Sequence, residues 1–380
     1  MAWLVPDYIT PMDFSYIINR CDILEGNLCL LGKLKSGKSM SIIFLSRKIT
    51  RAIKDARILV LVLRNLDVEK FKSAFNELGI NIQVLTYWQF KKAPTCFDYI
   101  LCDDVQLISQ ISLCEIKKYA NHVVVTINPN LRIFEKDPLT QTSTLTIEQV
   151  QDLLCPQVYE LNHVHNAFGD SVIELSKLLL DTNISSRHTL YRKVQSVHIT
   201  EASGLEEETK YIAEGSVRFL KCGYSVAILL PTSRDILSLI QSLIKNEGKE
   251  AWIEKLNKWG KLDFNNLNQY LLSIGLNYQC LGSNYGHLSD INNKINVMTY
   301  HGSMGFEFDN VFLPYVNSKL FINTNDEISK SVFVMAMTRS THYLNISYSG
   351  FMHPYLELIK DKCINCNAHD FIHNKNIFTL

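Results

Sequence analysis

The chain has 380 residues, of which 47% are hydrophobic, so it is long enough to form two hydrophobic cores. Its 38 Lys and Arg residues balance 38 Asp and Glu residues, which excludes an overall basic surface and leaves only a local patch for binding nucleic acid. Ten scattered cysteines, no secretory signal and no apolar run of membrane-spanning length favour a cytoplasmic protein without a membrane partner.

Short apolar runs rich in β-branched residues alternate with amphipathic segments of helical length. In the first half, strands are predicted at 27–31, 58–63, 82–86, 99–103 and 123–126, with helices such as 38–53 and 68–78 between them. In the second half, strands are predicted at 194–199, 225–230, 295–299, 310–314 and 343–348. This alternation predicts parallel sheets that are covered by helices on both faces.

The alternating pattern is interrupted after Cys155 and Pro156, which predicts a boundary between two α/β domains. We expect a first domain, a connecting segment, a second domain and a C-terminal tail, at residues 1–160, 161–190, 191–360 and 361–380.

Residues 32–39 fit the phosphate-binding pattern G-x-x-x-x-G-K-[ST], placed between a predicted strand and a predicted helix. Gly32 and Gly37 would let the backbone curl so that its amides point inward, and the helix N-terminus would add positive potential. Lys38 would reach the β- and γ-phosphates, and the Ser39 hydroxyl would bind magnesium. The alternative is a glycine-containing surface turn. The pattern therefore predicts ATP and Mg²⁺ as cofactors of the first domain.

The second half of such a site is a carboxylate at the end of a neighbouring strand, and the predicted strand 99–103 ends in paired aspartates. Asp103 is a candidate for the magnesium shell, and Asp104 for positioning or deprotonating water. A strand that ends in two aspartates is also a common start of a loop. The pairing with the phosphate-binding loop upstream favours the functional interpretation.

Residues 297–312 resemble motif V of the UvrD/Rep family of superfamily 1 helicases, T-x-H-x-x-K-G-L-E-F-D-x-V-F, with Thr299, His301, Gly305, Glu307, Phe308 and Asp309 matching in register. Residues 334–341 resemble motif VI, 103–106 the D-E-x-Q box, and 85–90 the T-F-H-x-F segment that faces single-stranded DNA in that family. The resemblance covers about residues 25–360. It implies an α/β fold with two RecA-like parallel-sheet P-loop NTPase domains in tandem, of which the first binds ATP.

The resemblance also implies roles for single residues. Lys38, Ser39 and Asp103 would hold the magnesium–triphosphate, and Gln106 would link hydrolysis to the bound strand. In the second domain, Glu307, which follows Gly305, would contact the ribose, and Arg339 would reach across the cleft as an arginine finger.

The resemblance places five residues beside a nucleic-acid strand: Tyr87, Trp88, Phe90, Thr299 and His301. The three aromatic residues could stack on bases, but ordinary core packing at the end of a strand explains them equally well.

Several positions depart from the family pattern. Asp104 replaces the glutamate that activates water, Leu131 replaces the glutamine that senses the γ-phosphate, and Met304 replaces the lysine of motif V. The segment 162–166 stands where the family has an N-Y-R-S box, and no glutamine precedes the phosphate-binding loop to read adenine. We therefore expect nucleotide binding with slow or impaired hydrolysis, while full activity stays open.

Three further groups of residues have weaker functional interpretations. Cys363, Cys366, His369 and His373 have the spacing of a zinc site, although a polar tail is favoured. His163 and His165 could be ligands, but an interdomain surface is favoured. A lysine group could line a nucleic-acid groove, although a solvated helix face is favoured; its members are Lys245, Lys249, Lys255, Lys258 and Lys261.

The sequence leads to two functional hypotheses. The first is an ATP-dependent translocase or helicase that acts on single-stranded nucleic acid, with DNA favoured, in repair, plasmid maintenance or phage defence. It would be a compact two-domain motor, because residues 241–295 leave no room for the extra domain of larger family members. The second is an ATP-binding regulatory subunit that senses nucleotide without turnover and acts through a partner protein.

Overall fold

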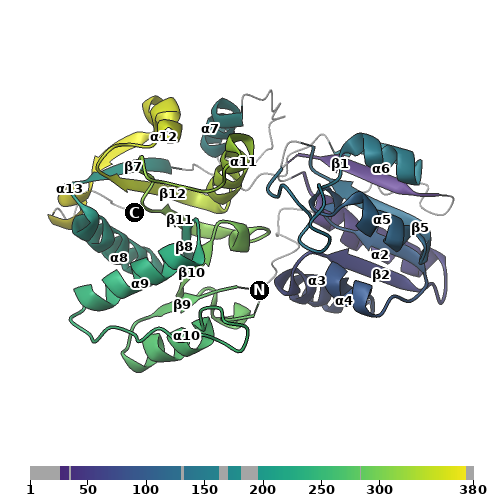
Figure 1. Ribbon diagram of the computed structural model, residues 1–380, viewed down its shortest axis with the longest axis horizontal. Coiled ribbons are helices and arrows are strands. Elements are labelled where there is room, and N and C mark those ends of the chain that lie inside the picture. Colours follow the sequence, from purple (N-terminus) through teal and green to yellow (C-terminus); the bar gives the residue numbers. More distant parts are fainter. Residues whose placement is uncertain are drawn as a thin grey trace. The chain divides into compact units, whose positions relative to one another are not determined.

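The computed structural model describes residues 26–33, 36–129, 132–161, 170–180, 196–282 and 284–373. Contacts between Cα atoms divide the chain into two compact units, the first ending before and the second beginning with the described helix α7 (Asp170–Leu180) (Figure 1). Among the described residues, every helix is too short or too polar to cross a membrane.

The first unit is built on a parallel sheet with the strand order β3-β2-β4-β5-β1-β6 in its described part. The strands are β1 (Leu28–Gly32), β2 (Ile58–Val62), β3 (Gln83–Thr86), β4 (Phe97–Cys102), β5 (Ala120–Ile127) and β6 (Gln157–Leu161). The helices are α2 (Lys38–Ala52), α3 (Asn65–Glu77), α4 (Tyr87–Lys92), η1 (Val105–Leu107), α5 (Gln110–Lys117) and α6 (Ile147–Leu154).

Both faces of this first sheet are buried, each in a core of its own. Val60 and Val62 of β2 pack with α2 and α3 in one core, whereas Leu59 and Leu61 pack with α4, α5 and α6 in the other. Successive side chains of a strand point to opposite faces, so a continuous aliphatic run such as β2 is what a sheet covered on both sides requires.

The second unit has a parallel sheet with the strand order β13-β7-β12-β11-β8-β10-β9 in its described part. The strands are β7 (Ser196–Ala202), β8 (Val226–Leu230), β9 (Tyr278–Cys280), β10 (Ile295–Thr299), β11 (Phe308–Leu313), β12 (Ser340–Ser349) and β13 (Ile364–Asn367). The helices are α7, α8 (Leu205–Lys221), α9 (Ser233–Asn246), α10 (Phe264–Ser273), η2 (Leu288–Asp290), η3 (His301–Ser303), α11 (Asp326–Met337), α12 (Pro354–Ile359), η4 (Lys360–Lys362) and α13 (Ala368–His373).

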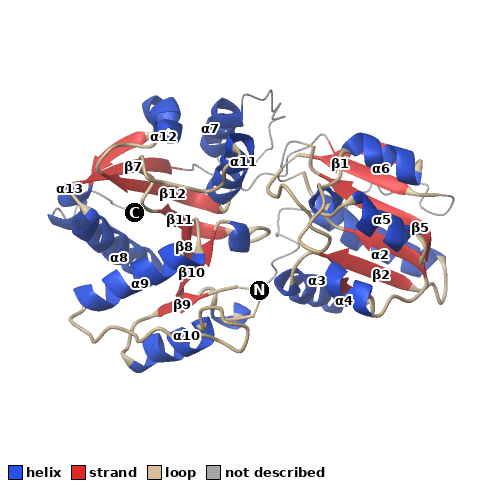
Figure 2. Cartoon of the chain, in the orientation of Figure 1, coloured by secondary structure: helices blue, strands red, loops and turns tan. Residues whose placement is uncertain are grey.

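Helices cover this second sheet on both sides as well (Figure 2). α8, α9 and α10 share one hydrophobic core with it, to which Tyr211, Ile240 and Leu267 contribute. α11 has no residue in that core and packs on the opposite face.

The predicted fold class, two RecA-like α/β units with parallel sheets in tandem, is confirmed, and each predicted strand is present with small shifts of its ends. Three strands were not predicted: β6, β9 and β13. All three lie at sheet edges; β6 and β13 mix polar with apolar residues, and β9 has only three residues. Such strands lack the long aliphatic run that marks a buried one.

Two of the expected segment boundaries differ from the structure. The described part of the expected connecting segment 161–190 contains α7, which packs against α11 and α12 of the second unit. Residues 364–367 pair with β7, so the expectation of a free polar tail is wrong for this stretch. The adjoining α13 buries Ala368 and Phe371 in the core of the second unit.

Candidate functional site

The loop that fits the phosphate-binding pattern joins the end of β1 to the start of α2, as predicted. Gly37 has φ 83° immediately before α2, a left-handed conformation that favours glycine. A Cβ atom on Gly32 would lie 2.0 Å from Ser36 Oγ, so no larger residue fits there without movement. Both glycines of the motif are therefore required by the path of the loop. Leu34 and Lys35 lie outside the described residues.

Lys38 Nζ donates to the carbonyl oxygens of Gly32 and Lys33, both at 3.1 Å. These bonds hold the ammonium group against the loop. α2 carries no acidic residue in its first turn, and its N-cap, Gly37, has no side chain to bond the first amides. The N-terminus of α2 therefore offers backbone N–H groups and positive potential to an anion.

Asp103 lies beside Ser39, at the end of β4. Ser39 Oγ donates to Asp103 Oδ2 at 2.6 Å, and Thr126 Oγ1 of β5 donates to Asp103 Oδ1 at 2.7 Å. The Ser39 hydroxyl and the Asp103 carboxylate are the hard oxygen ligands that Mg²⁺ prefers, so these residues fit the predicted cofactor.

The pKa of Asp103 is raised to about 7, because the carboxylate is withdrawn from water and lies beside Asp104; Ser39, Thr126 and Lys38 act in the opposite direction. A divalent cation bound beside Asp103 would favour the charged form of this carboxylate.

Asp104 is held by the turn that follows β4. Its φ is 50°, and its backbone N–H donates to Thr126 Oγ1 at 2.8 Å. Gln106 Nε2 donates to Asp104 Oδ1 at 3.1 Å, and Gln106 Oε1 accepts from the backbone N–H of Asn128 at 3.2 Å. Gln106 thus connects the acidic turn with the segment after β5, an arrangement consistent with the coupling role that the sequence predicts for it.

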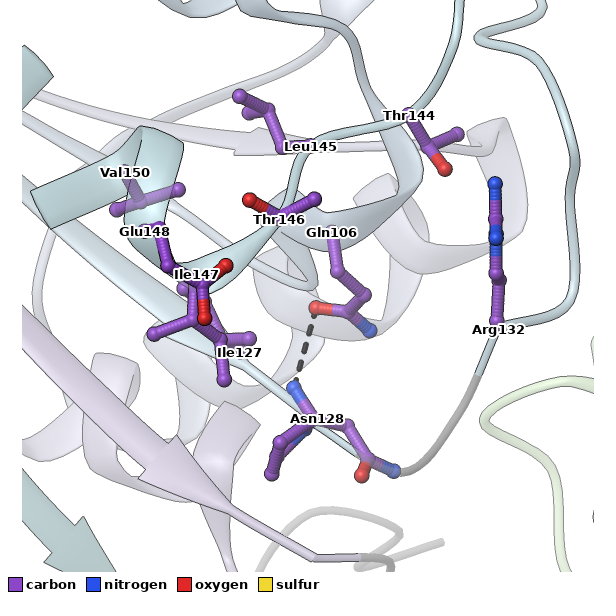
Figure 3. A pocket seen from close by; sticks show the side chains of 11 residues that line it. Gln106, Ile127, Asn128, Arg132, Thr144, Leu145, Thr146, Ile147, Glu148 and Val150 are labelled. Atoms are coloured by element: carbon purple, nitrogen blue, oxygen red, sulfur yellow. Dashed lines mark hydrogen bonds between the residues drawn. The ribbon is translucent and has the colours of Figure 1, made fainter. Parts of the chain in front are cut away.

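A cavity of about 300 Å³ opens beside Gln106 in the first unit. Figure 3 shows the Gln106 side chain bonded to the backbone of Asn128 at its edge, with the Arg132 side chain nearby. The lining residues come from the end of β5, the following loop and the start of α6: Gln106, Ile127, Asn128, Pro129, Arg132, Thr144, Leu145, Thr146, Ile147, Glu148 and Val150. The sequence did not predict this cavity, since its walls come from separate segments that only the fold brings together.

The three aromatic residues that were expected beside a nucleic-acid strand lie on α4. Thr86 caps this helix, so Tyr87 and Phe90 fall on one face and Trp88 on another. Tyr87 and Phe90 are buried in the hydrophobic core of this unit, and Tyr87 Oη donates to the backbone oxygen of Asp103 at 3.0 Å. The base-stacking role is wrong for these two rings, which have no exposed face.

Trp88 is 52% exposed, and Lys92 Nζ lies 3.4 Å from its ring centroid. Of the three aromatic residues, this one retains a surface on which a base could stack.

In the second unit, Thr299 ends β10 and its Oγ1 accepts from the backbone N–H of Gly302 at 2.9 Å. His301 begins η3 in this turn and is half-buried. Gly305 has φ 71°, and Glu307 is exposed just before β11. The motif V segment therefore forms a tight turn after β10, at the carboxyl end of the strand.

Arg339 is only 4% exposed. Its Nε donates to the carbonyl oxygen of Met335 at 2.9 Å, and its Nη1 to that of Phe306 at 3.1 Å. The second bond joins the segments that resemble motifs VI and V. For Arg339 to act on a nucleotide, these carbonyl oxygens would have to be exchanged for a phosphate.

Several predicted residues lie outside the described part of the chain: Leu131, the segment 162–166, and within it His163 and His165. Of the proposed zinc ligands, Cys366 Sγ lies 3.6 Å from His198 Nδ1, and the rings of His369 and His373 are 4.4 Å apart. Over the described residues, no three His, Cys, Asp or Glu side chains are gathered in a way that could hold a metal.

The family model of the UvrD-like helicase C-terminal domain matches residues 235–350, a stretch of the second unit that contains the predicted motifs V and VI. The resemblance to UvrD-type superfamily 1 helicases is thereby confirmed over these residues. No curated protein matches the chain.

Two helicases are among the solved structures that are similar to the chain. The C-terminal domain of a possible DNA helicase from Lactobacillus plantarum has a TM-score of 0.34 and 13% identity, over 53% of this chain and 98% of that one. The PRRSV helicase has a TM-score of 0.45 and 10% identity, over 88% of this chain but only 54% of the length of that one. Neither likeness is close enough to support a functional inference.

Proposed function

We propose that this chain is an ATP-dependent motor of the UvrD/Rep type that moves on single-stranded nucleic acid, with DNA as the favoured strand. The observation that carries the proposal is the joining of the phosphate-binding loop to the acidic turn, where Ser39 Oγ and Thr126 Oγ1 both bond the carboxylate of Asp103. The match of residues 235–350 to a helicase C-terminal domain supports the same class.

In this proposal the first unit binds the triphosphate. The N-terminus of α2 and Lys38 neutralise the phosphates, and Ser39 and Asp103 hold magnesium, which would spread the charge of the transferred phosphoryl group. Asp104 orients the attacking water. Gln106 passes a change in the position of Asp104 on to the backbone of Asn128, because its side-chain amide is hydrogen-bonded to both.

Glu307 and Arg339 stay proposed nucleotide contacts of the second unit. Thr299 and His301, at the carboxyl end of β10, and Trp88, on the first unit, stay proposed contacts of the strand. In related systems an arginine finger contributes about three to five decades in rate, so Arg339 would have a large effect if it leaves its present carbonyl partners.

The direct test is Mg²⁺-ATP binding and ATP turnover by the purified chain, each measured with and without a single-stranded DNA of mixed sequence. The motor predicts turnover that rises when DNA is added. Absence of DNA binding, together with an ATP turnover that does not change when DNA is added, would count against the proposal.

A second candidate is an ATP-binding regulator that signals to a partner protein without turnover. Its support is the acidic turn: Asp104 is one methylene shorter than the glutamate of the family pattern, and its Oδ1 is engaged by Gln106. The two candidates differ in the response to Asp104→Glu, which is described among the predictions below.

A further inference from the structure

A short turn lies between α9 and α10 of the second unit (Figure 1). It carries an exposed aromatic residue among lysines. Within residues 255–262, here called the Trp259 turn, Lys255, Lys258 and Lys261 are all exposed, and no acidic residue is present. Trp259 is 67% exposed. Tryptophan is usually well buried, so such exposure in a basic setting calls for a ligand. The expectation of a solvated helix face is wrong for these three lysines, because they do not lie on a helix.

The Trp259 turn is fixed by hydrogen bonds within itself. Leu256 and Leu262 form an antiparallel bridge, and the backbone N–H of Asn257 donates to the carbonyl oxygen of Lys261 at 2.7 Å. Asn257 Oδ1 accepts from the backbone N–H groups of Trp259 and Lys261, at 2.9 and 3.2 Å. Gly260 supplies the left-handed conformation at φ 71° that closes the turn. The indole is thus presented by an ordered backbone, at small entropic cost for a ligand that stacks on it.

The two acidic residues that flank the turn in sequence, Glu254 and Asp263, both interact with other residues of the second unit. Glu254 Oε2 pairs with Arg234 Nη1 at 2.8 Å, and Asp263 Oδ1 accepts from the backbone N–H of Asn266 to cap α10. The three lysines outnumber the two acidic residues that flank them, and one of these, Glu254, is already paired with Arg234, so the turn carries a net positive charge. Lys258 Nζ lies 4.5 Å from the ring centroid of Trp259, on one face of the indole.

The Arg234–Glu254 ion pair also locates the turn in the fold. Arg234 lies in the first turn of α9, which follows the carboxyl end of β8, and α10 starts directly after the Trp259 turn. The turn therefore belongs to the carboxyl edge of the second sheet. Since β10 runs parallel to β8, Thr299 at its end belongs to the same edge. Ligands of open α/β sheets bind at this edge.

From these observations we infer that the Trp259 turn is a contact site for single-stranded nucleic acid, in which a base stacks on Trp259 and the phosphates pair with Lys255, Lys258 and Lys261. Base stacking on an aromatic side chain beside lysines that follow the backbone is how proteins bind single strands without sequence preference. The inference rests on the proposed function and deepens it, because it names a strand-binding surface of the second unit outside the helicase-like motifs.

The test measures the affinity of the full chain for a fluorescein-labelled, mixed-sequence single-stranded DNA over a range of salt concentrations. Trp259→Ala should weaken binding about tenfold, whereas Trp259→Phe should retain most of the affinity. Lys258→Ala/Lys261→Ala should reduce the slope of log affinity against log salt by about 1.4, as expected for two lost phosphate contacts. Phe351→Ala is the matched control and should bind like the wild type, because Phe351 is 84% exposed in the same unit and no lysine stands between residues 343 and 359.

A second readout locates the contact. A single strand carrying 5-bromodeoxyuridine should cross-link under ultraviolet light to the peptide that contains Trp259. Unchanged affinity of Trp259→Ala and an unchanged salt slope of the double variant would overturn the inference, as would cross-links only elsewhere. Loss of affinity for a protein partner in Trp259→Ala with strand binding intact would overturn it too.

Failure of the motor is distinguishable from failure of this inference. A chain that binds DNA through Trp259 but never hydrolyses ATP would contradict the proposed motor function and support strand binding by the Trp259 turn. If Trp259→Ala and wild type have the same DNA-stimulated ATP turnover and the same affinity for the strand, the motor function is supported and strand binding by the Trp259 turn is contradicted.

Discussion

Ser39 Oγ donates to Asp103 Oδ2 at 2.6 Å, although the two residues are 64 positions apart in the chain. The bond joins the first turn of α2 to the carboxyl end of β4, and Thr126 Oγ1 of β5 holds the other carboxylate oxygen at 2.7 Å. Three elements thus converge on one carboxylate beside a phosphate-binding loop. In our account this carboxylate and the Ser39 hydroxyl become magnesium ligands when Mg²⁺-ATP binds.

Replacing Ser39 with alanine should lower the affinity for ATP only when magnesium is present. The hydroxyl would bind the cation, not the nucleotide itself, so we expect at least about a tenfold loss with Mg²⁺ and little change in EDTA. Isothermal titration with a non-hydrolysable ATP analogue measures this. Ser46→Ala, a buried serine later in α2, is the control. Equal losses with and without magnesium would contradict the role of Ser39.

Replacing Gly32 with alanine should abolish nucleotide binding without unfolding the protein. The new Cβ would lie 2.0 Å from Ser36 Oγ, so the loop must shift. The double variant Gly32→Ala/Ser36→Ala should recover part of the binding, because the nearest remaining atoms lie at 3.1 Å. Gly26→Ala, where a Cβ meets nothing within 4 Å, is the control. A single variant that binds ATP normally would show that the loop tolerates the side chain.

Replacing Asp104 with glutamate should distinguish the two candidate functions by its effect on ATP turnover. The added methylene moves the carboxylate toward the attacking water, and general-base catalysis contributes about two to four decades. Single-turnover hydrolysis with Mg²⁺-ATP measures the change, and Asp104→Asn serves as the control that removes the base. If the chain is a motor that hydrolyses ATP with Asp104, Asp104→Glu should hydrolyse ATP no faster than wild type. If the chain is a regulator that has lost hydrolysis, wild-type turnover should be negligible and Asp104→Glu should raise it.

Replacing Trp88 with alanine should weaken binding of single-stranded DNA by about 5- to 100-fold, the range expected for one lost base stack. Tyr87→Phe should leave DNA affinity unchanged, because the Tyr87 ring is buried and its hydroxyl bonds the backbone oxygen of Asp103 inside the unit. Fluorescence anisotropy at constant salt compares the two variants. A larger effect of Tyr87→Phe than of Trp88→Ala would reverse this assignment.

Asp309 should stabilise the second unit at neutral pH and lose this effect in acid. Burial acts against the charged form, but hydrogen bonds from His342 and Ser225 lower the pKa of Asp309 to about 2, from 3.8. A depressed pKa means that the stabilisation is complete above pH 3.8 and is lost as the pH falls through about 2. Its size is about 1–2 kcal/mol after allowance for partial exposure.

Urea unfolding of wild type and Asp309→Asn between pH 3 and pH 7 tests this, with Asp361→Asn at an exposed site as the control. The difference in free energy of unfolding between wild type and Asp309→Asn should shrink toward the acid end. A difference that is constant over the whole range would contradict the pKa of Asp309.

The sequence predicted the strand–loop–helix of residues 28–52 well, because a buried aliphatic strand, two glycines and a helix start coincide there. It could not predict the helix that begins at Tyr87. Which aromatic rings are buried depends on whether the chain continues as a strand after Thr86 or begins a helix there. The capping box formed by Thr86 favours the helix. Thr126 was missed, since its role depends on β5 lying between β1 and β4 in the sheet.

The second unit gives a similar lesson. The residues 297–312 and 334–341 were recognised because their spacing is specific, and Arg339 joins the two segments through the carbonyl oxygen of Phe306. The Trp259 turn has no such pattern. The spacing of five lysines over residues 245–261 suggested a helix face, whereas the Leu256–Leu262 bridge and the Asn257 hydrogen bonds show that a turn presents three of them with the tryptophan.

The measurement that tests the central claim most directly is steady-state ATP hydrolysis by wild type and Lys38→Ala, with single-stranded DNA titrated into each. Lys38 Nζ lies against the loop of residues 32–37 and, in our proposal, is the group on which binding of the triphosphate depends. We predict hydrolysis by wild type that increases with DNA to saturation, and none above background in Lys38→Ala at any DNA concentration. Equal hydrolysis by the two proteins, or wild-type turnover that DNA does not change, would contradict the account.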